Sequence, residues 1–254
     1  MDKTPNQNEF KQTALIFGGS GGIGSAIALE FISRQVKVAV ADKNPVSHSV
    51  LIQEQGNAVR YFPTDVTRED RVRECCQRVA AEFGTIDFLV SLAGGALADE
   101  FRGLEGGDLH TMSQSIDLNL KSHMVILKMT LSLFNAALKA DKSVVLVSSI
   151  NAVRGYGLPA YSAAKAGLIG LVNATAVELG AKGIRINAVL PGTVMTPRTA
   201  KQPKDFDAMR RGTALNRLAS PEEIAKVVVT LSIDMTCVTG QSVIADCGQV
   251  VKAP

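Results

Sequence analysis

The sequence has little of what metal, disulfide and membrane proteins need. Its 254 residues include no Trp, three Tyr and three His. No apolar run reaches the roughly 18 residues of a membrane span, and residues 1–12 are too polar to form a secretory signal. Neither the spacing of a metal site nor a disulfide framework fits the four cysteines, Cys75, Cys76, Cys237 and Cys247. We therefore expect a reduced, cytoplasmic protein with no bound metal and no membrane contact.

Charge is also low and unclustered. The formal net charge is +3 and charged residues make up 20% of the chain, so nothing in the composition calls for a nucleic-acid partner. The hydrophobic content of 46% is ordinary for a globular protein. The length suits one large α/β domain, which we place at residues 12–254 after a flexible segment at residues 1–11.

A glycine-rich turn joins the first predicted strand, residues 14–17, to a helix that runs to about Arg34. Two registers of the dinucleotide fingerprint fit the turn: Gly19, Gly21 and Gly24, or Gly18, Gly22 and Gly24. In both registers the missing side chains lie where a pyrophosphate would approach the backbone and the amides of a helix N-terminus. A flexible turn without a ligand is the alternative.

The second predicted strand, residues 36–41, is followed by Asp42. An acidic residue about 20 positions after the glycines, at the tip of the second strand, can accept both hydroxyls of an adenosine ribose. Its charge would repel a 2′-phosphate. Asp42 therefore favours NAD over NADP as the cofactor, although the adjacent Lys43 could weaken that preference.

The central stretch, residues 149–165, carries the candidate chemistry. It follows an apolar strand at residues 144–147, crosses a loop with Gly and Pro, and enters a helix at Tyr161. Tyr161 and Lys165 are four residues apart and so share one helix face. A neighbouring ammonium lowers the pKa of a phenol, about 10 when unperturbed, toward the range in which it transfers protons. By chance alone, one such pair would occur about one time in six.

The remaining predicted elements alternate between strands and helices. Further strands are expected at residues 58–62, 88–91, 185–190 and 242–245, and helices at residues 68–83, 111–139, 161–181 and 221–232, with another helix start at Pro45. Residues 96–108 read as irregular, and residues 193–213 as a mobile lid. This order predicts a single-domain, doubly wound (Rossmann) parallel sheet of six to seven strands with helices on both faces.

Together these motifs resemble the short-chain dehydrogenase/reductase family, in its branch of about 250 residues. The likeness covers nearly the whole chain. Its glycine motif matches Gly18, Gly22 and Gly24. The family's Asp-Val pair matches Asp65 and Val66, and its helix Asn matches Asn119. Its Ser-Tyr-Lys set matches Ser149, Tyr161 and Lys165. Its Pro-Gly motif matches Pro191 and Gly192, and its nicotinamide-contacting Thr matches Thr196.

The resemblance implies an NAD(P)-dependent oxidoreductase that interconverts a secondary alcohol and a ketone. Tyr161 would be the general acid/base, Lys165 would lower its pKa and hold the nicotinamide ribose, and Asn119 would anchor a water. Ser149 would bind the substrate oxygen, although the 13-residue spacing of many relatives would select Ser148. The implied NAD(H) contacts, with NADP(H) second, are Gly18, Ser20, Gly22, Ile23, Gly24, Asp42, Asp65, Val66, Ala93, Gly94, Tyr161, Lys165, Pro191, Gly192, Val194 and Thr196. Relatives are commonly tetramers, so a homo-oligomer is expected.

Three departures from the family pattern are local. Phe17 replaces a Thr, Ser91-Leu92 replaces Asn-Asn, and Cys247 replaces a Gly near the C-terminus. None of the three affects the catalytic residues.

A cofactor-binding regulator or scaffold without turnover is the competing class of function. An enoyl reductase is disfavoured because such relatives space Tyr and Lys more widely. The cationic lid suggests an anionic substrate or an acidic acyl carrier, against the simpler reading of a solvated loop.

Overall fold

One parallel sheet contains all the strands that the structure describes. The structure is a computed structural model that describes residues 10–44, 58–134, 141–201 and 205–252. The strand order is β3-β2-β1-β4-β5-β6-β7, and every neighbouring pair is parallel. The bounds are β1 Gln12–Phe17, β2 Val36–Asp42, β3 Val59–Pro63, β4 Phe88–Ser91, β5 Lys142–Val147, β6 Ile184–Pro191 and β7 Ser242–Ala245. The prediction of a doubly wound sheet is confirmed.

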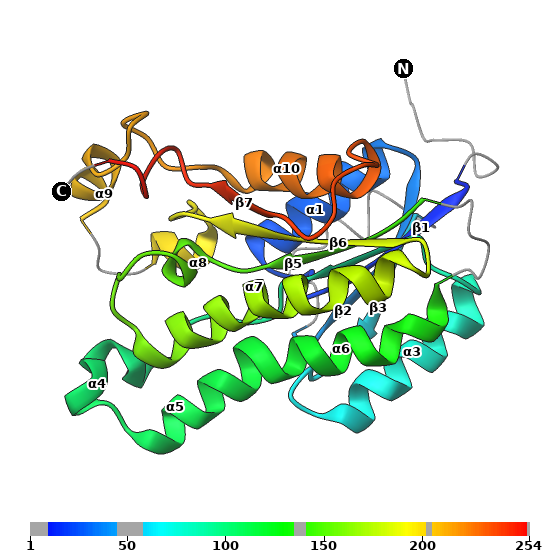
Figure 1. The fold of residues 1–254 in the computed structure, drawn as a ribbon, viewed down its shortest axis with the longest axis horizontal. Coiled ribbons are helices and arrows are strands. Elements are labelled where there is room, and N and C mark those ends of the chain that lie inside the picture. The colour runs from blue at the N-terminus through cyan, green and yellow to red at the C-terminus, as the bar shows by residue number, and fades with distance from the viewer. Residues whose placement is uncertain (1–9, 45–57, 135–140, 202–204, 253–254) are drawn as a thin grey trace.

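Helices cover both faces of the sheet (Figure 1). On one face lie α1 (Gly22–Ser33) and α10 (Pro221–Ile233), and on the other lie α3 (Glu69–Phe83), α6 (Ser122–Thr130) and α7 (Pro159–Gly180). Successive side chains of a strand point to opposite faces. Ile16 therefore packs with the α1–α10 core, while its neighbour Leu15 packs with the opposite core. Each face has its own apolar core, which fixes the position of the strand ends between them.

The register brings three strand ends level at the centre of the sheet. Phe17, the last residue of β1, pairs with Ala41 of β2 on one side and with Ser91 of β4 on the other. The chain leaves β1 toward β2 and later returns to the other side of β1 as β4. In open α/β sheets, ligands bind outside the carboxyl ends of the strands at such a reversal.

The long helix predicted at residues 111–139 is interrupted. Within the described residues it consists of α5 (Leu109–Ile116), a π-helical turn (Asp117–Lys121), α6 and a 3-10 turn (Leu131–Leu133). Residues 135–139 of the prediction lie outside the described part. A π-turn adds one residue to a helical turn and is frequent at functional sites. Here it contains Asn119.

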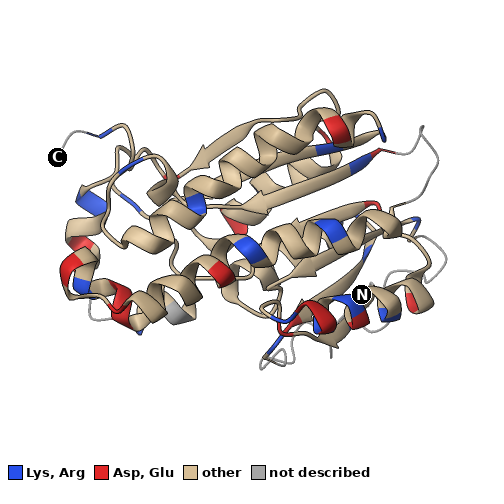
Figure 2. Ribbon diagram, turned by 60° about the horizontal axis from the view of Figure 1, so that its bottom comes forward, with Lys and Arg blue, Asp and Glu red and all other residues tan. Residues whose placement is uncertain are grey.

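Two segments that were predicted without regular structure contain short helical elements. The stretch expected to be irregular holds a 3-10 turn (Ala98–Arg102) and α4 (Gly103–Gly106). The expected lid contains two short helices, α8 (Pro197–Ala200) and α9 (Phe206–Arg211). The helix start predicted at Pro45 and residues 1–9 lie outside the described residues. Basic and acidic residues are interspersed over the ribbon (Figure 2). In the described part of the chain, no helix is both long and apolar enough to cross a membrane.

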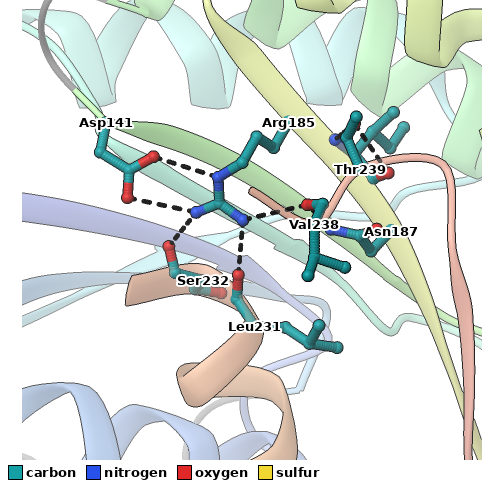
Figure 3. A network of polar contacts seen from close by, with 8 residues as sticks. Asp141, Arg185, Asn187, Leu231, Ser232, Val238 and Thr239 are labelled. Carbon is teal, nitrogen blue, oxygen red and sulfur yellow. Dashed lines mark hydrogen bonds and ion pairs between the residues drawn. The ribbon is translucent and has the colours of Figure 1, made fainter. Parts of the chain in front are cut away.

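A buried arginine joins the sheet to α10 (Figure 3). Arg185 of β6 is 8% exposed and donates to the carbonyl oxygens of Leu231 and Ser232, each at 2.7 Å. Its Nε and Nη2 also donate to the two carboxylate oxygens of Asp141, at 3.1 and 3.2 Å. The last carbonyls of a helix lack intrahelical partners. Arg185 therefore supplies hydrogen-bond donors to the last carbonyls of α10. It does so at the amino-terminal end of β6, away from the carboxyl ends of the strands.

Replacing Arg185 by Met should lower the free energy of unfolding by about 2 to 4 kcal/mol, because it leaves a half-buried carboxylate and two helix carbonyls without their donor. Equilibrium urea denaturation measures the change. Lys182→Met is the matched control, since Lys182 makes an exposed i,i+4 pair with Glu178 and should cost less than about 0.5 kcal/mol. Equal losses in the two variants would contradict this account of the network.

Candidate active site

A cleft with a volume of about 1490 Å³ lies at the carboxyl ends of the strands. All sixteen residues that the sequence predicted as cofactor contacts line it. They come from the last residues of β2 and β6, from the loops after β1, β3, β4 and β6, from the first turn of α1 and from α7. Residues distant in sequence are thus brought to one surface because parallel strands place their carboxyl ends at the same edge.

The glycine turn is held against the loop after β4. Gly18 has φ of +88°, and a Cβ there would lie 2.6 Å from the backbone nitrogen of Ala93. A Cβ on Gly24 would collide with the carbonyl oxygen of Gly18. Any side chain at either position would push apart the turn, the helix and the neighbouring loop. The turn therefore brings the N-terminus of α1, which begins at Gly22, close to the floor of the cleft.

Asp42 lies at the tip of β2 with its carboxylate at the cleft. One carboxylate oxygen accepts the amide of Ser20 at 3.1 Å and the other accepts the amide of Asn44 at 3.0 Å. These bonds join the glycine turn to the end of β2 and orient the carboxylate. The next strand end carries Asp65, whose pKa is lowered mainly by its hydrogen bond from the Thr67 hydroxyl. Asp65 therefore faces the cleft in its ionised form near neutral pH.

Tyr161 and Lys165 lie one turn apart on α7, and both line the cleft. The Lys165 ammonium nitrogen is 5.8 Å from the centroid of the Tyr161 ring. It donates to the carbonyl oxygen of Val147, the last residue of β5, at 3.0 Å. Lys165 is 2% exposed, and its burial lowers the pKa of the ammonium from 10.5 to about 8. A buried cation beside a phenol is an arrangement suited to stabilising the phenolate.

The two adjacent serines have different surroundings. Ser148 donates its hydroxyl to the carbonyl oxygen of Lys165 at 2.7 Å, which joins β5 to α7. Ser149 donates to the side-chain oxygen of Asn151 at 3.3 Å and accepts the Asn151 amide at 3.2 Å. Ser149 also lines a second, inner pocket that the cleft adjoins. The geometry thus favours Ser149 over Ser148 as the hydroxyl that a substrate would meet.

The inner pocket has a volume of about 390 Å³, near the lower end for small-molecule sites. It shares six lining residues with the cleft: Phe101, Ser149, Asn151, Leu158, Gly192 and Thr193. Its remaining lining residues are uncharged except for Glu100, and they include Ile150, Tyr156, Met209 and Gln249. A compact molecule seated there would lie beside the Ser149 hydroxyl.

Asn119 is buried in the π-turn rather than exposed on the cleft wall. Its side-chain oxygen accepts the Gly95 amide at 2.8 Å, and its nitrogen donates to the carbonyl oxygens of Gly95 and Ser115 at 3.1 and 3.0 Å. These bonds hold the loop after β4 against the helix. The structure therefore places Asn119 beside the site and shows its amide engaged with backbone groups.

Sequence reasoning missed His123 as part of the site. His123 is fully buried on α6; its Nε2 lies 3.0 Å from the carbonyl oxygen of Ala93, and its Nδ1 lies 2.7 Å from the hydroxyl of Ser91. A carbonyl can only accept, so Nε2 carries the hydrogen and Nδ1 accepts from Ser91. Burial, and then the charge of Lys165, lower the pKa of His123 to about 3, so it is neutral. The signal in the sequence was Ser91, which departs from the family's Asn.

The other two departures also have structural accounts. Phe17 is fully buried in the core beneath α3 and α6. Cys247 has φ of +55°, in the left-handed region that favours glycine, so a side chain there carries a conformational cost. Neither residue lines the cleft or the inner pocket.

The cationic lid does not supply charge to either cavity among the side chains that are described. Lys201, Arg210 and Arg211 line neither the cleft nor the inner pocket. Arg210 pairs with Asp207 at 2.7 Å on the exposed face of α9. Lys204 and the side chain of Arg198 lie outside the described part. The described lid cations fit the simpler reading of a solvated loop.

Comparisons with known proteins agree on the family. A family model described as enoyl-(acyl carrier protein) reductase matches residues 18–249. The chain is 36% identical to cis-4-hydroxycyclohexanecarboxylate dehydrogenase of Sinomonas cyclohexanicum over 88% of this chain and 90% of that one. It is 32% identical to the 3-oxoacyl-[acyl-carrier-protein] reductase FabG of Thermotoga maritima over 94% and 98% of the two chains.

A solved structure supports the same assignment. The structure of ElxO with NADP bound superposes with a TM-score of 0.86 at 27% identity, covering 95% of this chain and all of that chain. The match to the family model spans the glycine turn, the strand tips and α7. The protein therefore belongs to the short-chain dehydrogenase/reductase family, whose members are oxidoreductases that bind nicotinamide cofactors.

Proposed function

We propose that this oxidoreductase interconverts a secondary alcohol and a ketone, with Tyr161 as the general acid/base. The observation that carries the proposal is the position of Tyr161 and Lys165. The pair lines the same cleft as the glycine turn, and Ser149 lies where the cleft adjoins the inner pocket. A regulator that only bound a cofactor would not need a buried ammonium beside a phenol, and burying that charge is costly.

The residues of the cleft fit a dinucleotide. The space left by the absent side chains of Gly18 and Gly24, the N-terminus of α1 and the Asp42 carboxylate suit a pyrophosphate and a ribose. When bound, the nicotinamide supplies the hydride chemistry. Ser149 would donate a hydrogen bond to the substrate oxygen. Tyr161 would give a proton to that oxygen during reduction and take it back during oxidation.

Lys165 would act through its charge and its spare hydrogen-bond donors. An ammonium has three donors, and the Val147 carbonyl accepts one of them. The others can hold ribose hydroxyls, while the positive charge stabilises the Tyr161 phenolate. Asn119, engaged with Gly95, would keep the loop after β4 in place; anchoring a water there stays a prediction.

For the cofactor we propose NAD(H) over NADP(H). The Asp42 carboxylate at the tip of β2 would hold the adenosine ribose and would repel a 2′-phosphate on it. Lys43 also lines the cleft and could offset that repulsion, and the similar ElxO structure has NADP bound. The balance between these adjacent charges decides the preference.

For the substrate we propose a compact alcohol or ketone that fits the inner pocket. Its volume accommodates a single ring with short substituents. A cyclic alcohol is consistent with the relative named for a hydroxycyclohexanecarboxylate, and a 3-oxoacyl thioester with the FabG relatives. A spectrophotometric panel of cyclic alcohols, sugars, steroids and 3-oxoacyl thioesters with both cofactors would separate these classes.

Location and assembly stay predictions. We propose a cytoplasmic homo-oligomer, a tetramer or dimer. Large apolar side chains are exposed on the outer helices, with Val177 of α7 85% exposed and Leu109 of α5 80% exposed, as expected where copies of a chain associate. Analytical ultracentrifugation of the purified protein measures the state.

Replacing Tyr161 by Phe should abolish turnover, with a loss of at least about a hundredfold in kcat, because the ring remains but the transferable proton is gone. Binding of NADH, followed by its fluorescence, should change less than about twofold. Retained turnover would refute the role of Tyr161. A wild-type protein that binds NADH but oxidises or reduces nothing in the panel would instead favour a regulator or scaffold.

Replacing Asp42 by Ala should shift the cofactor preference toward NADP(H), since the repulsion of a 2′-phosphate is removed while Lys43 remains. We expect the ratio of kcat/KM for NAD to that for NADP to fall at least about tenfold. Lys43→Ala is the matched control and should raise the same ratio. A wild-type enzyme that already prefers NADP(H) would overturn the proposed preference.

The buried Lys165 should make stability depend on pH. Its folded pKa is about 8 and its ordinary value is 10.5, so the unfolded chain binds more protons between these values and stability rises with pH there. Relative to Lys165→Met, the wild type should gain about 2 kcal/mol between about pH 7 and about pH 9.5. Urea denaturation of the cofactor-free protein measures both curves, and parallel curves would contradict the lowered pKa.

A further inference from the structure

Glu100 is a buried carboxylate that the catalytic assignment leaves unused. It lies in the 3-10 turn Ala98–Arg102 and is 1% exposed. Glutamate is almost never fully buried unless it is paired. Its two carboxylate oxygens accept backbone amides: Oε1 accepts the amide of Tyr161 and Oε2 that of Leu97, each at 2.8 Å. The carboxylate thus joins two segments that are 64 positions apart in the sequence, one of which carries the proposed acid/base.

The start of α7 needs this acceptor. The helix begins at Pro159, which has no amide hydrogen, and the residue before it, Leu158, has an apolar side chain that cannot cap. The Ser162 amide reaches the Leu158 carbonyl at 2.8 Å, so it is satisfied within the turn. The Tyr161 amide precedes the first such bond and would be one of the unpaired donors of the helix N-terminus. Glu100 satisfies it from outside the helix, and a negative charge is favourable there.

The second bond of Glu100 reaches the wall of the cleft. Leu97 belongs to the loop after β4, which two other buried side chains also hold. His123 bonds the Ala93 carbonyl and Asn119 bonds both backbone groups of Gly95. The backbone of Ala93, Gly95 and Leu97 is therefore held by hydrogen bonds from three buried side chains. Of these three attachments, the one made by Glu100 also extends to α7.

We propose that Glu100 is a positioning residue, which sets the place of Tyr161 relative to the loop after β4 and to the inner pocket. The proposal rests on the proposed role of Tyr161. Glu100 also lines the inner pocket, together with Ser149 and Leu158, while its carboxylate accepts the Tyr161 amide in the first turn of α7. Because it holds the backbone of Tyr161 directly, a change at Glu100 moves the phenol without removing it.

The energetic reason is the sensitivity of proton and hydride transfer to geometry. Reacting atoms must lie about 3 to 3.5 Å apart, and displacement by about 1 Å can cost about a hundredfold in rate. Glu100→Gln is nearly isosteric, but its amide nitrogen is a donor and would face a backbone donor. One of the two bonds is lost, so the first turn of α7 or the loop must shift.

The test compares kcat with cofactor binding. Glu100→Gln should lower kcat at least about tenfold with the best substrate of the panel, while the Kd of NADH, measured by fluorescence, changes less than about twofold. Glu100→Asp keeps the charge and both acceptor oxygens, so it should recover part of the loss. If Glu100→Gln does not fold, Glu100→Asp supplies the measurement, with kcat expected below wild type at unchanged NADH binding.

Ser220→Ala is the matched control. Ser220 caps α10 through the Glu223 amide at 3.3 Å, so the variant loses a helix cap remote from α7 and should leave kcat unchanged. A kcat of Glu100→Gln within about twofold of wild type would overturn the proposal, as would losses of kcat and of NADH binding in equal proportion. Turnover that survives in Tyr161→Phe would overturn the proposed function instead, and the positioning role with it.

Discussion

Two reciprocal hydrogen bonds between β5 and α7 are the constraint on which the site depends. The Lys165 side chain donates to the Val147 carbonyl, and the Ser148 side chain donates to the Lys165 carbonyl. Each segment thus supplies one donor and one acceptor to the other, and both bonds are buried. Together they hold the second turn of α7 at the carboxyl end of β5, so the Tyr161 phenol one turn earlier lies at the strand ends.

The loop after β4 forms another wall of the cleft that Tyr161 and Lys165 line. Contacts from other parts of the chain, which the loop's own sequence does not reveal, hold it in place. Residues 93–96 are all Ala or Gly, whose side chains can form little apolar packing. Their order comes instead from buried polar side chains on other elements, His123, Asn119 and Glu100, whose hydrogen bonds with this backbone are 2.8 to 3.1 Å long. An unsatisfied buried amide costs about 1 to 3 kcal/mol, so each attachment resists displacement. A wall built mainly of Ala and Gly can approach a flat ligand closely and still keep its place.

Sequence reasoning predicted the strands, the glycine turn and Asp42 from local patterns: apolar runs, glycines at fixed offsets and an acid at a strand tip. The resemblance to the family added further residues that line the cleft, such as Asp65 and Thr196. Sequence reasoning did not predict the π-turn at Asn119, since an extra residue in a helical turn has no signature in apolar periodicity. It also missed His123 and Glu100. Their partners are backbone groups 30 and 61 positions away, and a backbone amide or carbonyl looks the same in every residue. Contacts of this kind become visible only when the fold is known.

The site therefore combines two buried groups of opposite sign, Glu100 in the 3-10 turn Ala98–Arg102 and Lys165 on α7, and each is held by backbone groups. Glu100 meets two amides and Lys165 meets a carbonyl, so neither charge is cancelled by direct pairing with the other in the contacts described here. A direct ion pair would have neutralised the ammonium and reduced its influence on the phenol. Because the carboxylate accepts the amides of Leu97 and Tyr161 instead, the positive charge of Lys165 acts on the Tyr161 phenol. Burying Lys165 as a cation costs free energy, as its lowered pKa shows. The burial of apolar side chains in the two cores on either side of the sheet offsets that cost.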